Sequence, residues 1–338
     1  MTEITVVIPT HQRRESLRRA LASLETQTLA AETYEVVVGV DRSTDGTTEM
    51  LKTLALPYLL RVVETPGQGR ASALNAALRL AEGNLVVMLD DDMQVVPQFL
   101  ERHRSHHPPG SRRCVMGAVP VRISEASPRA ARHIATNFDA HMKRLAEPGH
   151  VYVPRDFYSG NASVFINVIA EVGWFDERFD AYGNEDVELG VRLRLAGVEF
   201  GFAADAVAHQ DYGKDLVELA QDTVAKGTTT VRLARTHPDL FAMLRLANPK
   251  DGSRAWLAAR SVLLALTRRR VGLPQLIFRV AGALERAGLW RYPLFYRAVL
   301  DYAFWAGVEY GLNPAEDSQP LVSLATELQR GPLRLLLD

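Results

Sequence analysis

The feature that most constrains this chain is the pattern of a buried strand that ends in three consecutive acids. Residues 85–89 form an apolar run short enough for a strand buried on both faces, and Asp90, Asp91 and Asp92 follow it directly. In an open α/β sheet this strand end is where ligands bind, and a cation best offsets crowded like charges. Alternate side chains share a face, so Asp90 and Asp92 are expected to face one ion while Asp91 points elsewhere. The pattern indicates a metal-diphosphate site for Mg²⁺ or Mn²⁺, and an acidic solvated loop is the alternative.

Strands and helices alternate on both sides of this run. Apolar, β-branched runs predict strands at 4–8, 34–40, 59–63, 114–123 and within 157–166. Leucines and alanines at helical spacing predict helices around 17–24, 50–54 and 71–81, and a helical excursion is expected at 124–154. This alternation predicts βαβ units and a parallel sheet.

Composition excludes several classes of protein. The net charge of −1 gives no bulk attraction to nucleic acid or anionic lipid, so partners have to be recognised at local sites. The single cysteine, Cys114, cannot form an internal disulfide, which fits a reducing compartment. The N-terminal residues lack a signal-peptide pattern, and no apolar run is long enough to span a membrane. We therefore expect a cytoplasmic protein.

Two further stretches invite specific functions that the residues do not support. Gly67-Gln68-Gly69 lacks the third glycine of a dinucleotide fingerprint, because Ser72 stands there. A loop that lets the backbone approach a ligand, with Arg70 available to a phosphate, fits better. The basic stretch 102–107 has no aromatic stacking platform, so a solvated helix face is predicted in place of a nucleic-acid or metal site.

A second acidic cluster opens a predicted helix. Glu185 and Asp186 precede apolar positions at 187–195, and Gly197 closes the segment. The acids could simply stabilise the helix N-terminus. Alternatively, a carboxylate at a pocket rim could serve as general base for an incoming hydroxyl. With the first cluster holding a metal-diphosphate leaving group, the pair would make a transferase site.

Together these residues resemble family 2 glycosyltransferases. Seven motifs occur in the family's order, at 6–10, 41–47, 67–75, 89–92, 160–162, 172–176 and 184–189. The resemblance covers about residues 3–212. It implies an α/β protein with the GT-A fold, that is, the nucleotide-diphospho-sugar transferase fold with a Rossmann-like mixed sheet. The expected domains are a catalytic domain over 1–212 and an α-helical domain over 213–338.

The resemblance also implies an activity and the residues that carry it. It implies inverting transfer from a nucleoside diphosphate sugar, most simply a UDP-sugar, with Mn²⁺ or Mg²⁺ as cofactor. Asp186 matches the catalytic base, with Glu185 alongside. The residues assigned to the nucleotide are Pro9, Thr10, Asp41, Gly67, Arg70, Asp90 and Asp91. Asp92 is the surest metal ligand, with Asp90 and His209 as the others, although a structural role fits His209 equally well. The Gln-x-x-Arg-Trp motif that processive members of the family carry is missing, so the predicted enzyme is non-processive.

The C-terminal third reads as helices rich in aromatic residues. Helices are predicted at 216–234, 255–266, 276–284 and 296–308, with Arg268-Arg269-Arg270 among them. Aromatic residues with arginines can mark an interfacial membrane helix. Packing as a helical domain that shapes the acceptor pocket or a dimer contact is the expectation, because monomers seldom leave such patches bare.

Other functions stay open beside the glycosyltransferase. A nucleotidyltransferase also uses strand-end acids and a cation, but would want a glycine-rich loop where Pro9-Thr10-His11-Gln12 stands. A nucleotide-sugar-binding or membrane-associated scaffold without catalysis is the non-enzymatic alternative. The acceptor could be a glycan, a lipid-linked or a small molecule, and no nucleic-acid partner is expected. A peripheral contact with the inner face of the membrane and a homodimer also stay open.

Overall fold

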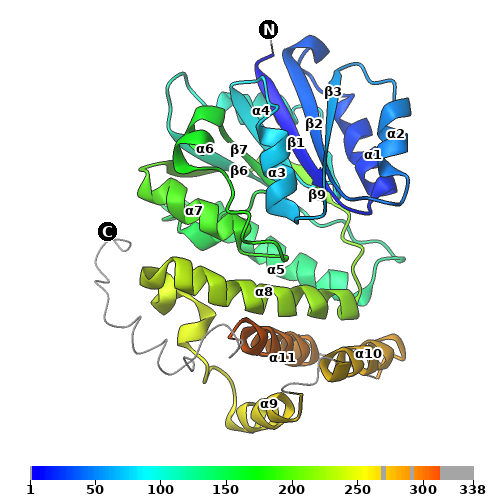
Figure 1. Cartoon of the computed structure of the whole chain (residues 1–338), viewed down its shortest axis with the longest axis vertical. Helices are drawn as coiled ribbons and strands as arrows, with labels where there is room; N and C mark the ends of the chain where they lie inside the picture. Colours follow the sequence, from blue (N-terminus) through cyan, green and yellow to red (C-terminus); the bar gives the residue numbers. More distant parts are fainter. Residues whose placement is uncertain (1, 268–271, 290–292, 313–338) are drawn as a thin grey trace. The chain divides into compact units, whose positions relative to one another are not determined.

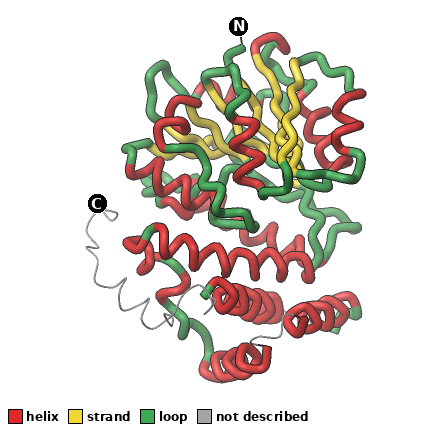
Figure 2. The backbone as a smooth tube through the Cα atoms, in the orientation of Figure 1, coloured by secondary structure: helices red, strands yellow, loops and turns green. Residues whose placement is uncertain are grey.

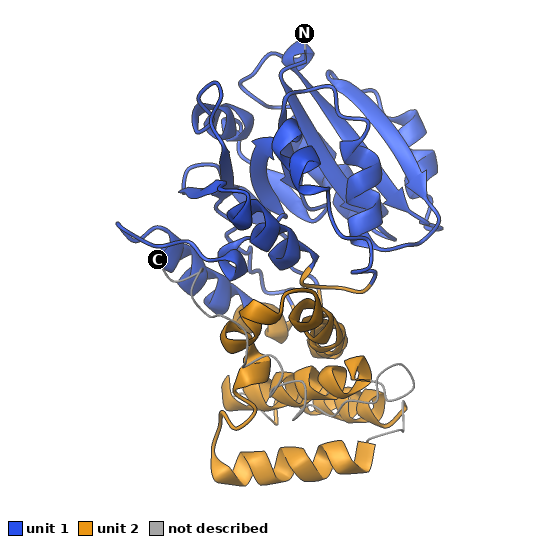
Figure 3. Cartoon of the chain, turned by 60° about the vertical axis from the view of Figure 1, so that its left-hand side comes forward, with its two compact units in different colours: residues 1–127, 134–180, 185–213 blue, residues 128–133, 181–184, 214–338 orange. Residues whose placement is uncertain are grey.

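The structure is a computed structural model that describes residues 2–267, 272–289 and 293–312. The chain forms two compact units (Figure 3). Unit 1 comprises residues 1–127, 134–180 and 185–213, and unit 2 comprises residues 128–133, 181–184 and 214–338. The division into functional domains after residue 212 stays a prediction.

Unit 1 is built on a mixed seven-stranded sheet in the order β3-β2-β1-β4-β7-β6-β8 (Figure 1). Strands β1 to β4 are parallel, β7 is antiparallel to both β4 and β6, and β6 is parallel to β8. The strands are β1 Ile4–Thr10, β2 Tyr34–Asp41, β3 Leu59–Thr65, β4 Leu85–Leu89, β6 Arg113–Gly117, β7 Asn161–Phe165 and β8 Glu199–Ala203. The predicted α/β architecture with a mixed sheet is confirmed.

Helices cover both faces of this sheet (Figure 2). Side chains alternate along a strand, so Val6 packs in one hydrophobic core with α1 and α4 while Val7 packs in the other with α3 and α7. In α1, Leu17, Leu21 and Leu24 are fully buried, as their spacing predicted. The helices of this unit are α1 Arg14–Leu24, α2 Thr47–Thr53, α3 Arg70–Leu78, α4 Phe99–Ser105, α6 Ile166–Val172 and α7 Glu185–Leu195. Helix α5 Arg129–Leu145 has its first residues in unit 2 and the rest in unit 1.

A short antiparallel ribbon completes unit 1 and corrects one prediction. It pairs β5 Met93–Val95 with β9 Ala208–Gln210. The strand expected over 114–123 is β6 and stops at Gly117, because the chain then runs beside β9. There the carbonyls of Ala118 and Pro120 accept hydrogen bonds from the amides of Ala208 and Gln210. The predicted strand was too long because these residues pair outside the main sheet.

A second correction concerns the basic stretch in and after α4. His103 and His107 are buried, with 0% and 7% of their surface exposed, so the predicted solvated face is wrong for these two histidines. Their neighbours Arg102 and Arg104 are exposed, as expected. Hydrogen bonds to β7 explain the burial of the histidines and are described below.

Unit 2 is a helical bundle of α8 Leu216–Thr236, α9 Arg254–Thr267, α10 Gly272–Arg286 and α11 Pro293–Gly311. Helices α8 and α11 approach closely, since a Cβ atom on Gly307 would lie 1.9 Å from the carbonyl oxygen of Val224. Tyr302, Phe304 and Trp305 are at most 5% exposed, so these aromatic residues form a core. Trp290, Tyr292 and Arg268–Arg270 lie outside the described residues. Within the described ranges, no helix has the length and apolar character needed to cross a membrane.

Candidate active site

The predicted site residues of unit 1 gather at one edge of the sheet. Parallel strands β1, β2 and β4 end there at Thr10, Asp41 and Leu89, directly before the three acids. Strand β7 runs the other way, so it begins at this edge, and the Asp90 amide donates a 2.9 Å hydrogen bond to the Gly160 carbonyl. The strand topology therefore brings residues 10, 41, 90–92 and 160 to the same edge.

Asp91 is turned into the protein. Its carboxylate accepts a 2.7 Å hydrogen bond from the Thr10 hydroxyl and lies 3.5 Å from Nη1 of Arg13. Burial, with the added repulsion of Asp92 and Asp90, raises the pKa of Asp91 to about 7 against the attraction of Arg13. Asp91 thus ties the end of β1 to the end of β4.

Asp92 is held from two sides. Nη1 of Arg13 lies 3.0 Å from one carboxylate oxygen, and the Gln210 amide approaches both oxygens at 3.3 and 3.4 Å. Burial and the neighbouring Asp90 raise the pKa of Asp92. The carbonyl oxygen of the Gln210 side chain is buried and has no hydrogen-bond partner. An unused oxygen acceptor therefore lies on the residue that contacts Asp92.

Arg70 joins the two acidic clusters. It follows Gly69, whose φ of 90° suits glycine, and opens α3. Its guanidinium donates to Asp90 at 2.6 Å, to Glu185 at 3.1 Å and to the Ser159 hydroxyl at 2.8 Å. Burial lowers the pKa of Arg70, but Asp90 and Glu185 outweigh burial and raise it overall. The strand-end acids and the helix-opening acids thus share one cation.

Glu185 and Asp186 open α7, as predicted. Glu185 is 5% exposed, and its Oε2 atom is buried without a hydrogen-bond partner. Burial, followed by repulsion from Asp186, raises the pKa of Glu185 to about 7. The Asp186 carboxylate is half-buried and accepts a 2.8 Å hydrogen bond from the Val187 amide. The site therefore offers one unused buried acceptor beside a second carboxylate.

Asp41 organises the loop that follows β3. Its carboxylate accepts hydrogen bonds from the Thr65 hydroxyl and from the amides of Gly67, Gln68 and Gly69, at 2.6 to 3.1 Å. These bonds fix the loop just before Arg70. Contacts of Asp41, Gly67 and the buried Pro9 with a nucleotide stay a prediction.

His209 lies in the same ribbon but forms neither a hydrogen bond nor an ion pair with Asp92, whereas the next residue, Gln210, donates to that carboxylate. Within the described ranges, no three His, Cys, Asp or Glu side chains lie close enough together to hold a metal ion. The three-ligand role predicted for Asp90, Asp92 and His209 stays a prediction. Sequence reasoning missed Arg13 and Gln210. Arg13 could have been found, because it stands in the loop after the β1 strand end, whereas Gln210 had no local signal.

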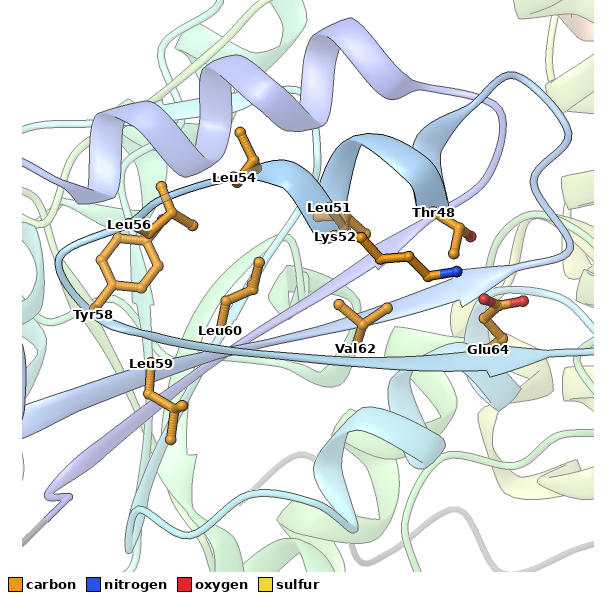
Figure 4. A pocket seen from close by; sticks show the side chains of 10 residues that line it. All are labelled: Thr48, Leu51, Lys52, Leu54, Leu56, Tyr58, Leu59, Leu60, Val62 and Glu64. Atoms are coloured by element: carbon orange, nitrogen blue, oxygen red, sulfur yellow. The ribbon is translucent and has the colours of Figure 1, made fainter.

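Two hollows of unit 1 are lined by other residues. Figure 4 shows one of about 470 Å³ between α2 and the edge strand β3, lined mainly by leucines with Lys52 and Glu64. A second, of about 750 Å³, is lined in part by His107, Ser111 and Arg112. No predicted site residue lines either hollow.

Comparison with known proteins identifies the class. The model of glycosyl transferase family 2 matches residues 5–168. Residues 5–168 therefore form a domain of this family, and the chain has the GT-A fold. Among solved structures, the mannosyltransferase PcManGT from Pyrobaculum calidifontis, in complex with GDP-Man and Mn²⁺, aligns with a TM-score of 0.58 and 22% identity over 92% of this chain and 87% of that one. TarS 1–349 of S. aureus in complex with UDP-GlcNAc aligns with a TM-score of 0.52 and 18% identity, over 94% of this chain and 93% of that one.

The names of the curated relatives point to different substrates. Validoxylamine A glucosyltransferase of Streptomyces hygroscopicus subsp. jinggangensis (strain 5008) is 28% identical over 71% of this chain and 62% of its own length. The pre-mycofactocin glycosyltransferase of Mycobacterium tuberculosis (strain CDC 1551 / Oshkosh) is 25% identical over 99% of this chain and 69% of its own length. The chain spans 58 to 64% of the length of the three relatives named first in that comparison.

Proposed function

We propose that this protein is a non-processive, inverting glycosyltransferase that moves a sugar from a nucleoside diphosphate sugar to an acceptor hydroxyl. The observation that carries the proposal is the bridge formed by Arg70, which holds Asp90 at the end of β4 and Glu185 at the start of α7 in one site. A transferase needs one group of residues for the leaving diphosphate and another for the acceptor, and this bridge puts both within the reach of one guanidinium.

The residues around Asp92 fit a divalent cation. Carboxylates of Asp90 and Asp92 and the unpartnered amide oxygen of Gln210 are oxygen donors, which Mg²⁺ and Mn²⁺ prefer. We assign Asp92 as the first ligand, with Asp90 beside it and His209 as the further ligand that the family resemblance implies. When bound, the cation would offset the charge that develops on the departing diphosphate.

The acids at the start of α7 serve the acceptor. Asp186 accepts the proton of the acceptor hydroxyl while that oxygen forms a bond to the anomeric carbon. The bond to the diphosphate breaks on the opposite face, so the configuration inverts. Glu185 stands alongside, with its unpartnered Oε2 available to a hydroxyl group.

The remaining residues at this edge would form the nucleotide side of the site. Thr10 and Asp91 are joined by a hydrogen bond, and Asp41 fixes the loop that carries Gly67 and leads to Arg70. Pro9 completes this group. We favour a UDP-sugar as donor, and a glycan, a lipid-linked molecule or a small molecule as acceptor. With the buried Cys114 as its single cysteine, we assign the protein to the cytoplasm.

The experiment that tests the proposal is a panel of nucleotide sugars scored by thermal shift with Mn²⁺. A donor that binds the folded state raises the unfolding temperature by mass action, and mixing that donor with acceptors should release the free nucleoside diphosphate. If no nucleotide sugar shifts the unfolding temperature and none is turned over, the proposal is wrong.

Asp92→Ala should abolish the Mn²⁺-dependent part of donor binding, because the first ligand of the cation is removed. Calorimetry with UDP and Mn²⁺ measures this loss. The matched control is Asp205→Ala, an exposed acid that pairs with Arg102 and should leave the affinity unchanged. Equal affinities for the Asp92 variant and the control would contradict the metal assignment.

A further inference from the structure

We propose that His103, which touches none of the site's acids, is a positioning residue that holds Asp90 and Asp92 in place through Asn161. The inference rests on the proposed function only in its use of nucleotide binding as one measurement. It starts from the two histidines whose burial the sequence did not predict.

His103 and His107 form a hydrogen-bonded ladder with β7. His103 lies on α4 and His107 stands two residues after the end of that helix, while Asn161 and Ser163 are alternate residues of β7 and share a face of the strand. Nε2 of His103 lies 2.8 Å from Oδ1 of Asn161, and Nδ1 lies 2.8 Å from the Ser163 hydroxyl oxygen. Nε2 of His107 lies 2.7 Å from the same hydroxyl oxygen. Four side chains thus form one continuous buried chain.

The direction of each hydrogen bond in the ladder can be assigned. Burial lowers the pKa of His103 to about 4 and that of His107 to about 3, so both rings are neutral at pH 7. The amide nitrogen of Asn161 donates to the carbonyls of Ala118 and Ala206, at 3.1 and 3.0 Å, which leaves Oδ1 as the acceptor. Nε2 of His103 must therefore be the donor, and Nδ1 accepts from the hydroxyl of Ser163.

The same assignment explains an unpartnered atom at the far end. Because the hydroxyl hydrogen of Ser163 points to His103, its oxygen accepts from Nε2–H of His107. That leaves Nδ1 of His107 as an acceptor, and this atom has no hydrogen-bond partner. The donors therefore run consistently along the ladder: His107 donates to Ser163, Ser163 donates to His103, and His103 donates to Asn161.

Asn161 connects this ladder to both outer acids of the triplet. The residue before it, Gly160, accepts the amide hydrogen of Asp90, and a Cβ atom at position 160 would lie 2.4 Å from Oδ2 of Asp90. On the other side, Asn161 holds Ala206 just before β9, and Gln210 of β9 contacts Asp92. A turn of the Asn161 side chain would break its bonds to Ala118 and Ala206 and loosen the start of β7, which Gly160 directly precedes. His103 supplies the donor that prevents such a turn.

Two substitutions at position 103 separate positioning from simple packing. In His103→Gln the amide N–H can reach Asn161 as Nε2–H does, whereas the shorter side chain of His103→Asn reaches only as far as Nδ1. His107→Gln is the matched control, because it lies in the same ladder and does not touch Asn161. Affinity for UDP with Mn²⁺ should fall about tenfold in His103→Asn, as expected when a buried acceptor loses its donor, and stay within about twofold in the other two variants.

Calorimetry well below each variant's unfolding temperature provides the affinities, and hydrogen exchange of residues 158–162 and 206–211 provides a readout that needs no nucleotide. Exchange in these segments should be faster in His103→Asn than in wild type, His103→Gln or His107→Gln. If His103→Asn does not fold, Asn161→Ser removes the same contact from the other side. We then expect Asn161→Ser to show the same fall in affinity and the same faster exchange.

The outcomes are distinguishable. Wild-type exchange and affinity in the His103→Asn protein would overturn the inference. An equal loss of affinity in His107→Gln would overturn it too, because both effects would then come from packing alone. If wild-type protein binds no nucleotide with Mn²⁺, the proposed function fails, while the exchange comparison still decides the role of His103.

Discussion

At the scale of single residues, each acid of the strand-end triplet lies against an arginine. Arg70 contacts Asp90, and Arg13 contacts both Asp91 and Asp92. Burying carboxylates costs free energy unless they are paired, and at this edge the repulsion among the acids adds to that cost. The two arginines therefore stabilise a cluster of charge that the fold could not otherwise hold. A cation that binds at Asp92 would compete with Arg13 for the same carboxylate.

The role of Asp186 can be separated from donor binding by one isosteric substitution. Asp186→Asn keeps the shape of the side chain and can still accept the hydrogen bond from the Val187 amide, but it cannot take up a proton. We expect the turnover number to fall by a factor on the order of 10² or more while donor affinity stays within about twofold. Steady-state kinetics and calorimetry measure the two quantities. Unchanged turnover would mean that the carboxylate only stabilises the start of α7.

Individual site residues were predictable where a strand end or a helix start marked them. Asp91 and Glu185 stand at such positions, and the structure brings each to the sheet edge where the sequence suggested a site. The partners were not predictable in the same way. Gln210 lies 118 residues after Asp92 in the chain, and Ser159 lies 89 after Arg70, so only the folded sheet brings each pair together.

At the scale of secondary-structure elements, the α4–β7 ladder should make stability depend on pH. Both histidines have an ordinary pKa of 6.5, whereas burial lowers the pKa to about 4 for His103 and about 3 for His107. Between these values and 6.5 the unfolded chain binds protons that the folded chain does not. The stabilisation is therefore complete above pH 6.5 and is lost as the pH falls toward 4.

His103→Gln should flatten this dependence, because the amide keeps the hydrogen bond and cannot be protonated. The slope of the unfolding free energy against pH between about 4.5 and 6.5 should decrease by up to about 1.4 kcal/mol per pH unit, the limit for one titrating group. Urea unfolding at several pH values measures the slope. An unchanged slope in His103→Gln would contradict the assignment.

Most elements were predictable because their patterns are local. Apolar runs and leucine-spaced helices predicted β1 to β4, α1, α3 and α7, because the burial of each segment is marked in its own residues. The length of β6 was not predictable, because the residues after Gly117 look like a strand and pair with β9 instead. His103 and His107 were misread for a similar reason: their partners lie on β7, about 60 residues later in the chain.

Helix α11 carries a buried charge on which unit 2 should depend. Asp301 accepts hydrogen bonds from Arg245, from the indole of Trp256 and from Arg260, which is itself 6% exposed. Asp301→Ala would leave Arg260 buried without its carboxylate. We expect the free energy of unfolding to fall by about 3–5 kcal/mol, as measured by chemical denaturation followed by tryptophan fluorescence.

Asp222→Ala provides the comparison for Asp301, since it removes a partly exposed acid of α8 that pairs with Lys214. A partly exposed pair of this kind contributes about 1 kcal/mol or less. Losses of similar size in the two variants would show that the pairing around Asp301 contributes no more than a surface ion pair.

At the scale of the whole molecule, the question is whether the C-terminal helices hold the protein at a lipid surface. Several described aromatic residues are engaged within unit 2, where Arg260 lies 4.9 Å from the Trp305 ring centroid and the Trp256 indole donates to Asp301. The large apolar side chains that the described parts of α9, α10 and α11 expose are aliphatic, among them Val262 and Leu266 on α9, at 59% and 60%. With a net charge of −1, the chain has no bulk attraction to anionic lipid.

We therefore expect the intact protein to stay in the lipid-free fraction when it is floated with phosphatidylserine-containing liposomes at low salt. Aromatic and arginine side chains that are already paired within unit 2 cannot also anchor it at an interface, and isolated aliphatic residues bind lipid weakly. Tryptophan emission should likewise not shift on adding liposomes. Flotation that salt reverses would overturn this expectation. The double variant Val262→Asp with Leu266→Asp would then show whether α9 is the contact. Loss of flotation would assign the interface to that helix, because entry of two carboxylates into the lipid is costly.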